Sequence, residues 1–306
     1  MTLHRLTSIT IGVPDPEQTA AYYADFGLLL EEDGALTTAD GGKQLTVVRA
    51  PTRRLVELGV GCDDADDLQR VSSRLTRMGY EHRCRTDELV AHEPGMGVRV
   101  RLTVAPPIER APAPAPMFNG PGRTTRTDTR AAAVERSGPV RPRKLGHVVL
   151  GSTDQETSQR FFTEGLGFKV SDEVPGIAAF LRCSTDHHNV LVQPAPVAFL
   201  HHTSWEVDDV DEIGRGAHHM LEGHPERHVW GLGRHHIGSN FFWYLKDPAG
   251  NFSEYYSDLD CIVDEALWKP DVFTDLRALY SWGPPVPPSF IEPEDLAALM
   301  AGAHSQ

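Results

Sequence analysis

Hydrophobic and polar residues follow the same order at two places that lie far apart in the chain. Residues 6–15 alternate as a β-strand does and end in a turn, and residues 17–26 place apolar side chains at helical spacing. The same order returns 139 positions later, in residues 145–154 and 156–168. Equivalent positions carry identical or similar residues: 6 and 145, 12 and 151, 15 and 154, 23 and 162. The pattern therefore predicts an internal repeat of a strand followed by a helix.

A second repeat has an offset of 145 positions. Residues 62–68 match residues 207–213, and each stretch carries several acidic residues where a helix is expected to begin. The two offsets divide the chain into four units, each with one strand, one helix and further strands. We therefore expect an α+β fold in which four modules pair into two similar domains.

The middle of the chain has a different composition from its flanks. Residues 106–143 contain eight prolines, and seven arginines stand against three acids, with no helical or strand period. We expect a solvated surface linker there, the alternative being a basic arm that contacts an acidic neighbouring surface. The expected bounds are 1–105 for an N-terminal two-module domain, 106–143 for the linker, 144–260 for a C-terminal two-module domain and 261–306 for a C-terminal strap or lid that partly covers the site.

Charge and apolar runs exclude several classes of partner. Lys plus Arg number 29 and Asp plus Glu 43, a net charge of −14, which disfavours nucleic acid and anionic membranes as general partners. No apolar run is long enough to span a membrane, and the N-terminus shows no secretion signal. The four cysteines form no CxxC pair. We therefore expect reduced thiols and a cytoplasmic location.

Three polar residues on separate predicted strands of the second half form a candidate metal site: His147, His202 and Glu254. At the matching positions the first half has Ser8, Glu57 and a stretch, 97–101, without a carboxylate. Two imidazoles and one carboxylate on one face of an ion leave positions open, which suits Fe(II) binding an organic substrate and O2 together. The alternative is that each side chain has a purely structural role.

Tyr244 is a further candidate. It precedes Glu254 by ten residues across the turn 247–251, so the two are expected on adjacent antiparallel strands. Tyr244 also ends the aromatic run that begins at Phe241, so packing in the core accounts for it equally well.

The stretch from Gly233 to Tyr256 resembles the signature of type I extradiol catechol dioxygenases, members of the vicinal oxygen chelate superfamily. The resemblance implies βαβββ modules, with each domain an incomplete β-barrel and helices outside. It implies that His147, His202 and Glu254 bind Fe(II), with Mn(II) as a second option. It also implies catalytic roles for three further residues: His188 as acid and base, Tyr244 as hydrogen-bond partner of a substrate oxygen, and His235 above the substrate oxygens.

Histidine doublets leave the register open by one position. His187, His201 and His236 are the alternative residues, and strand alternation lets only one member of each doublet face the metal. Some branches of the family carry an acidic residue just after the position of His235. This chain has none at 236–240, which leaves Ser239 or Asn240 as candidate substrate contacts.

The resemblance implies that the chain cleaves the ring of a catechol with O2, giving a semialdehyde or keto acid, as a catechol 2,3-dioxygenase does. The partners expected are a monocyclic or bicyclic catechol, O2, and further copies of the chain in a homo-oligomer. Two rival functions stay open: another enzyme of the superfamily, such as a glyoxalase or epimerase, or a binding protein for aromatic compounds without catalysis.

Overall fold

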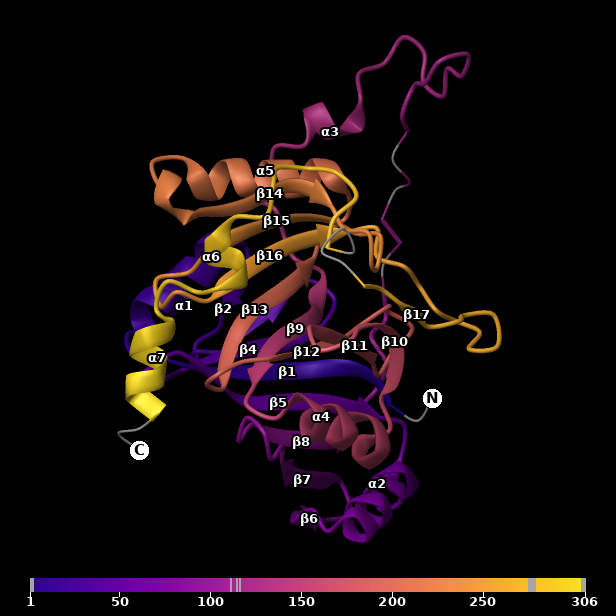
Figure 1. Cartoon of the computed structure of the whole chain (residues 1–306). Coiled ribbons are helices and arrows are strands. Elements are labelled where there is room, and N and C mark those ends of the chain that lie inside the picture. The colour runs from indigo at the N-terminus through magenta and orange to yellow at the C-terminus, as the bar shows by residue number, and fades with distance from the viewer. Residues whose placement is uncertain (1–2, 111, 114, 116, 275–278, 304–306) are drawn as a thin grey trace.

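Two β-sheets, one from each half of the chain, form the body of the molecule (Figure 1). The computed structural model describes residues 3–110, 112–113, 115, 117–274 and 279–303. The sheets share a topology: in each, two four-stranded units meet through an antiparallel pair of strands, β1 with β5 and β9 with β13, and β17 adds a ninth strand at one edge of the second sheet.

The first sheet has the strand order β2-β3-β4-β1-β5-β8-β7-β6. Helices α1 and α2 each follow the first strand of a unit, so the order βαβββ occurs twice. The bounds are β1 (Leu3–Val13), α1 (Pro16–Asp25), β2 (Leu29–Leu30), β3 (Leu36–Thr38), β4 (Gly42–Arg49), β5 (Arg54–Cys62), α2 (Ala65–Met78), β6 (His82–Cys84), β7 (Glu88–His92) and β8 (Arg99–Val104).

The second sheet repeats this plan in the order β14-β15-β16-β13-β9-β12-β11-β10-β17. Its first helix, α4, continues into a π-helix, η1, and a short 3-10 helix, η2, follows α5. The bounds are β9 (Lys144–Ser152), α4 (Gln155–Arg160), η1 (Phe161–Leu166), β10 (Lys169–Val174), β11 (Ala178–Arg182), β12 (Val190–Pro194), β13 (Phe199–Glu206), α5 (Val210–Leu221), η2 (Pro225–Arg227), β14 (His228–Arg234), β15 (Phe241–Lys246), β16 (Phe252–Ser257) and β17 (Asp271–Val272).

An aspartate caps the N-terminus of the helix in each of the four modules. In every case its carboxylate accepts a hydrogen bond from the backbone N–H three residues later, at 2.9 to 3.1 Å; the caps are Asp15, Asp64, Asp154 and Asp209. Such a cap stabilises a helix by about 1 kcal/mol. The α+β fold of four modules that the two repeats predict is confirmed, and each module has the βαβββ order that the resemblance implies.

One apolar core runs through both halves of the chain. Helix α1 packs against the second sheet, where Phe26 stacks on Tyr255 with ring centroids 3.8 Å apart. The Tyr22 hydroxyl lies 2.6 Å from the Ser253 hydroxyl of β16. Burial of these aromatic side chains holds the two sheets in a fixed relation.

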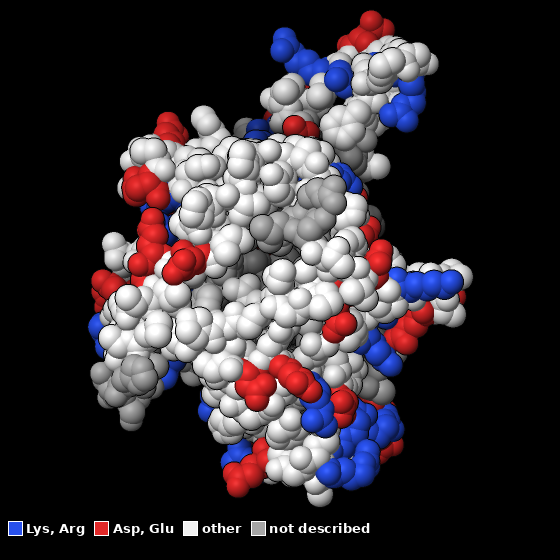
Figure 2. All heavy atoms as spheres, in the orientation of Figure 1, with Lys and Arg blue, Asp and Glu red and all other residues white. Residues whose placement is uncertain are grey.

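The linker is anchored at both ends, and its middle projects from the body, together with the short helix α3 (Ala132–Glu135; Figure 1). Arg110 forms an ion pair with Glu206, Arg136 with Asp209 at 2.7 Å, and Arg143 with Asp208 at 2.6 Å. The expectation of a solvated connector is therefore wrong at these arginines, which contact the acidic start of α5 and the end of β13. Figure 2 shows further basic side chains on the projecting part.

The C-terminal segment packs across the second sheet and back onto the first. It contains α6 (Pro288–Ile291) and α7 (Leu296–Ala303). The buried Arg53 donates hydrogen bonds to both carboxylate oxygens of Asp295 and to the Leu200 carbonyl, which ties three parts of the chain together. Within the described residues, no helix has the length and apolarity needed to cross a membrane.

Candidate metal centre

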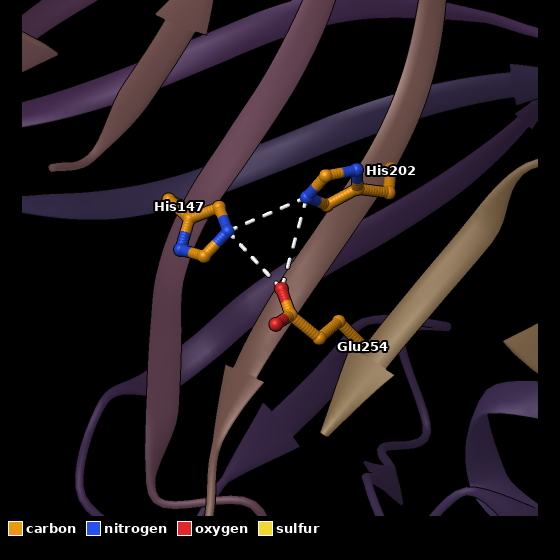
Figure 3. Close-up of side chains that lie close together, drawn as sticks. All are labelled: His147, His202 and Glu254. Atoms are coloured by element: carbon orange, nitrogen blue, oxygen red, sulfur yellow. Dashed lines mark hydrogen bonds and ion pairs between the residues drawn. The ribbon is translucent and has the colours of Figure 1, made fainter. Parts of the chain in front are cut away.

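His147, His202 and Glu254 converge on one point from three neighbouring strands (Figure 3). They lie on β9, β13 and β16, which are adjacent in the second sheet. The Nε2 atoms of the two histidines are 3.4 Å apart, and Glu254 Oε2 lies 3.1 Å from His147 and 3.7 Å from His202. All three side chains are buried. In the described part of the chain, no other His, Cys, Asp or Glu residues form such a group.

The geometry fits a divalent ion held by three protein ligands. Ligand atoms about 2.1 Å from an ion and at right angles to one another lie about 3 Å apart, close to the separations found here. Glu254 Oε2 is buried and accepts no well-aligned hydrogen bond. A buried carboxylate oxygen without a donor is costly unless a cation satisfies it.

Protonation also suits metal binding. Burial by itself would raise the pKa of Glu254, but the neighbouring imidazoles of His147 and His235 outweigh it and hold the pKa far below its ordinary value. Burial lowers the pKa of His202 well below its ordinary range. The site therefore presents an ionised carboxylate and an uncharged imidazole, the forms that bind metal.

Asn240 orients the carboxylate. Its amide Nδ2 donates to Glu254 Oε1 over 3.1 Å, and the side chain is fully buried. Ser239 instead donates to Asp260 Oδ2 over 2.9 Å. Neither residue lines the cavity beside the site, and substrate contact by either of them stays an untested possibility. Asn240 stabilises one orientation of a metal-binding group.

A cavity of about 360 Å³ opens beside the three residues and brings in the other candidates. His188, His235 and Tyr244 all line it. Tyr244 lies directly opposite Glu254 in the β15–β16 ladder, as the turn predicted, and its hydroxyl is 2.9 Å from His235 Nε2. Burial, together with the charge of Glu254, raises the pKa of Tyr244 well above its ordinary value, so the phenol stays protonated.

Most of the rest of the cavity wall is apolar, with Gln193 as a polar exception. A cluster of six buried side chains, separate from the main core, faces it in full: Val149, Val174, Ala178, Phe180, Leu191 and Ile237. Leu279, Phe290 and Ile291 of the C-terminal segment also line it. None of the described lining residues is Lys, Arg, Asp or Glu.

Two of the histidine doublets are hydrogen-bonded pairs at the cavity wall. His201 Nδ1 lies 2.8 Å from His202 Nδ1, and His187 Nδ1 lies 3.0 Å from His188 Nδ1. A β-bulge between Leu200 and His202 interrupts the alternation of β13, so both His201 and His202 reach the cavity. The simple alternation rule missed this contact.

Two other doublets behave differently. His236 is exposed and packs on Phe273, and His218 and His219 are exposed on α5. Of the alternative residues, His187 and His201 each contact the neighbouring histidine, and His201 also lines the cavity, whereas His236 lies outside it. The roles of all these residues stay proposals, taken up below.

Comparison with known proteins gives matches of two kinds. Residues 144–255 match the family described as the glyoxalase/bleomycin resistance protein/dioxygenase superfamily. Metapyrocatechase 2 of Cupriavidus necator is 37% identical over 155 residues, which cover 50% of this chain and 48% of that protein. The iron-dependent extradiol dioxygenase of Rhodococcus jostii is 27% identical over 190 residues, covering 54% and 62%. The matches thus span roughly half the length of these relatives.

The fold extends the likeness over the whole chain. The Mn(II)-bound glyoxalase of Novosphingobium aromaticivorans superposes with a TM-score of 0.74 at 25% identity, over 95% of this chain and 94% of that one. The match covers the two-sheet plan as well as the half that holds His147, His202 and Glu254.

Proposed function

We propose that this chain, whose residues 144–255 belong to the glyoxalase/bleomycin resistance protein/dioxygenase superfamily, is an extradiol dioxygenase that cleaves the ring of a catechol with O2. The observation that carries the proposal is the meeting of His147, His202 and Glu254 at the wall of a cavity that also presents a phenol and three further imidazoles. The relatives named above, a metapyrocatechase and an extradiol dioxygenase, support the same activity.

Fe(II) is the proposed ion, with Mn(II) as the alternative. Three protein ligands on one side leave room for both hydroxyl oxygens of a catechol and for O2. When bound, a redox-active ion would supply the electronic link that lets a catechol react with O2. Zn²⁺ would bind to the same three ligands, but it has no redox chemistry and so would not supply this link.

The remaining polar groups would manage the protons of the substrate. His188 has its Nδ1 occupied by His187, so Nε2 is the atom available to take a proton from a substrate hydroxyl and later return it. The protonated phenol of Tyr244, paired with His235, would donate a hydrogen bond to the second substrate oxygen. His188 loses its charge readily because burial and neighbouring histidines lower its pKa well below the ordinary value.

The cavity favours an uncharged catechol. Its apolar cluster would contact the ring and any substituent, and no described lining residue is a Lys or Arg that would bring a permanent positive charge to a carboxylate substituent. Burying an unpaired charge there would cost several kcal/mol. A comparison of 4-methylcatechol with 3,4-dihydroxybenzoate tests this point, because the two differ in a methyl and a carboxylate. We expect kcat/KM to favour the methyl compound by at least about tenfold.

The activity is tested by loading the protein with Fe(II) without air and adding catechol and O2. Uptake of O2 with a new near-ultraviolet or visible absorbance from a ring-opened product supports the proposal. Bound iron at one ion per chain, with no O2 uptake for any catechol in a monocyclic and bicyclic panel, contradicts it.

A metal-dependent glyoxalase is the second candidate, because a Mn(II)-bound glyoxalase shares the fold over nearly the whole chain. This activity uses neither O2 nor a catechol. The three ligands found here have no fourth His, Cys, Asp or Glu within their group among the described residues. Conversion of a 2-oxoaldehyde–thiol adduct by the Mn(II) form, together with failure on catechols, favours this candidate.

A further inference from the structure

In two of the doublets, 187/188 and 201/202, the first histidine lies between the second histidine and a fixed hydrogen-bond acceptor. His201 Nε2 lies 2.6 Å from the Phe290 carbonyl oxygen, and His201 Nδ1 lies 2.8 Å from His202 Nδ1. His187 Nε2 lies 2.9 Å from Asp172 Oδ2, and His187 Nδ1 lies 3.0 Å from His188 Nδ1. All four imidazoles are buried.

The acceptor decides which nitrogen of His201 carries hydrogen. A carbonyl oxygen only accepts, so Nε2 of His201 must donate to Phe290. In an uncharged imidazole the other nitrogen then accepts, so His202 Nδ1 must be the donor between the two rings. This leaves the lone pair of His202 on Nε2, the atom that faces His147 and Glu254.

The same order holds in the other doublet. The carboxylate of Asp172 accepts from His187 Nε2 and, through its second oxygen, from the backbone N–H of Asp271 over 2.7 Å. With His187 uncharged, its Nδ1 is then the acceptor for His188 Nδ1–H. The lone pair of His188 is left on Nε2, and the His188 side chain lines the cavity.

We propose that His187 and His201 are positioning residues that fix the tautomers of His188 and His202, so that both present a Nε2 lone pair to the site. The expected effects on turnover rest on the proposed metal-dependent function. The metal affinity and the tautomers, in contrast, can be measured without a substrate. The β-bulge at His201 is the backbone feature that allows the contact in β13.

The first test compares His201→Leu with His201→Asn. The amide oxygen of asparagine can replace Nδ1 as acceptor for His202, whereas leucine leaves the His202 N–H buried and unpaired. We expect His201→Leu to raise the dissociation constant for Fe(II) or Co(II) by about 10- to 100-fold, with His201→Asn recovering most of the loss. His218→Leu is the matched control, because His218 is the first member of an exposed doublet.

The second test reads the tautomers directly. Nitrogen NMR of the Zn²⁺-loaded or metal-free protein should find hydrogen on Nδ1 of His188 and His202 and on Nε2 of His187 and His201. His187→Leu should leave metal affinity unchanged and lower kcat by about tenfold or more without a matching rise in KM, and His187→Asn should recover part of kcat.

Three results would overturn the inference. The first is a metal affinity of His201→Leu equal to that of His218→Leu. The second is hydrogen on Nε2 of His202 or His188 in the unaltered protein. The third is an equal loss of metal affinity or of kcat in the asparagine and leucine variants, both being folded. If a leucine variant does not fold, the NMR assignment and the asparagine variants still decide. Absence of turnover with every catechol would contradict the proposed function and leave the affinity and NMR results valid.

Discussion

Glu57 and Arg101 form an ion pair, with Oε1 3.2 Å from Nε, at the two strand positions that His202 and Glu254 occupy in the second sheet. The strand registers establish the equivalence. Glu57 lies opposite Thr10 in the first sheet, as His202 lies opposite Val149 in the second. Arg101 lies opposite Gly59, as Glu254 lies opposite Ser204. Arg99 contacts the same carboxylate at 2.6 Å. In the first half, guanidinium groups thus supply the positive charge that an ion would supply in the second.

We therefore expect one metal ion per chain, bound in the second half. Glu254→Gln should weaken binding by more than the roughly 10- to 100-fold that changes outside the ligand set produce, because it removes a ligand charge. Glu57→Gln, the matched change in the first half, should leave metal content and affinity unaltered. Metal analysis and chelator competition measure both. Equal loss of metal in the two variants would contradict the assignment.

Asn240→Ala should weaken metal binding through Glu254. The variant removes the donor to Oε1, which leaves the buried carboxylate free to rotate away from the two histidines. We expect a rise of about 10- to 100-fold in the metal dissociation constant, measured by competition with a chelator. Ser239→Ala is the control, since its hydroxyl contacts Asp260 instead. Unchanged affinity in Asn240→Ala would show that Glu254 needs no such support.

Gly146→Ala should destabilise the protein, because a Cβ at this position would lie 2.0 Å from the hydroxyl oxygen of Tyr256. Tyr256 is buried and has little room to move, so strand β9, which carries His147, must shift. Overpacking of this kind costs about 1–3 kcal/mol.

Gly214→Ala in α5 is the opposite case, since no heavy atom lies within 4 Å of the new Cβ. Replacing a helical glycine with alanine should stabilise the protein by up to about 1 kcal/mol. Urea unfolding measures both variants. A Gly146→Ala protein as stable as the unaltered one would contradict the close contact.

Sequence alone predicted features that depend on short-range order or on repetition. The acidic residues of 62–68 and 207–213 predicted where two of the helices begin, because capping is local, and Asp64 and Asp209 are the caps found there. The repeat singled out His147, His202 and Glu254, since the first half lacks equivalents. The turn after β15 predicted the pairing of Tyr244 with Glu254.

Features that depend on one irregular position or on distant partners escaped prediction. A bulge in β13 places His201 beside His202, where alternation predicts opposite faces. The contact between Asn240 and Glu254 depends on the shape of the loop that carries Asn240, and no periodicity in the sequence predicts that shape. The anchoring of Arg136 by Asp209 joins residues 73 positions apart, so composition alone favoured a solvated linker.

Asp247 should make the stability of the protein depend on pH in the direction opposite to most carboxylates. Burial raises its pKa from 3.8 to about 6, although hydrogen bonds from Asn251 and Ala249 partly oppose the rise. The folded state therefore binds this proton more tightly than the unfolded state does. The stabilising contribution is complete below the unfolded pKa and is lost as the pH rises through about 6. Two pKa units correspond to about 3 kcal/mol.

Asp247→Asn isolates this effect, because the amide does not titrate and its oxygen can still accept from the backbone N–H groups of Ala249 and Asn251. Urea unfolding of both proteins at several pH values between about 4 and 7 gives the difference in their free energies of unfolding. We expect that difference to move in favour of the variant by up to about 3 kcal/mol as the pH rises. Other groups titrate equally in both proteins, so their contributions cancel. A difference that stays constant across this range would mean that Asp247 is ionised at the same pH in the folded and unfolded states.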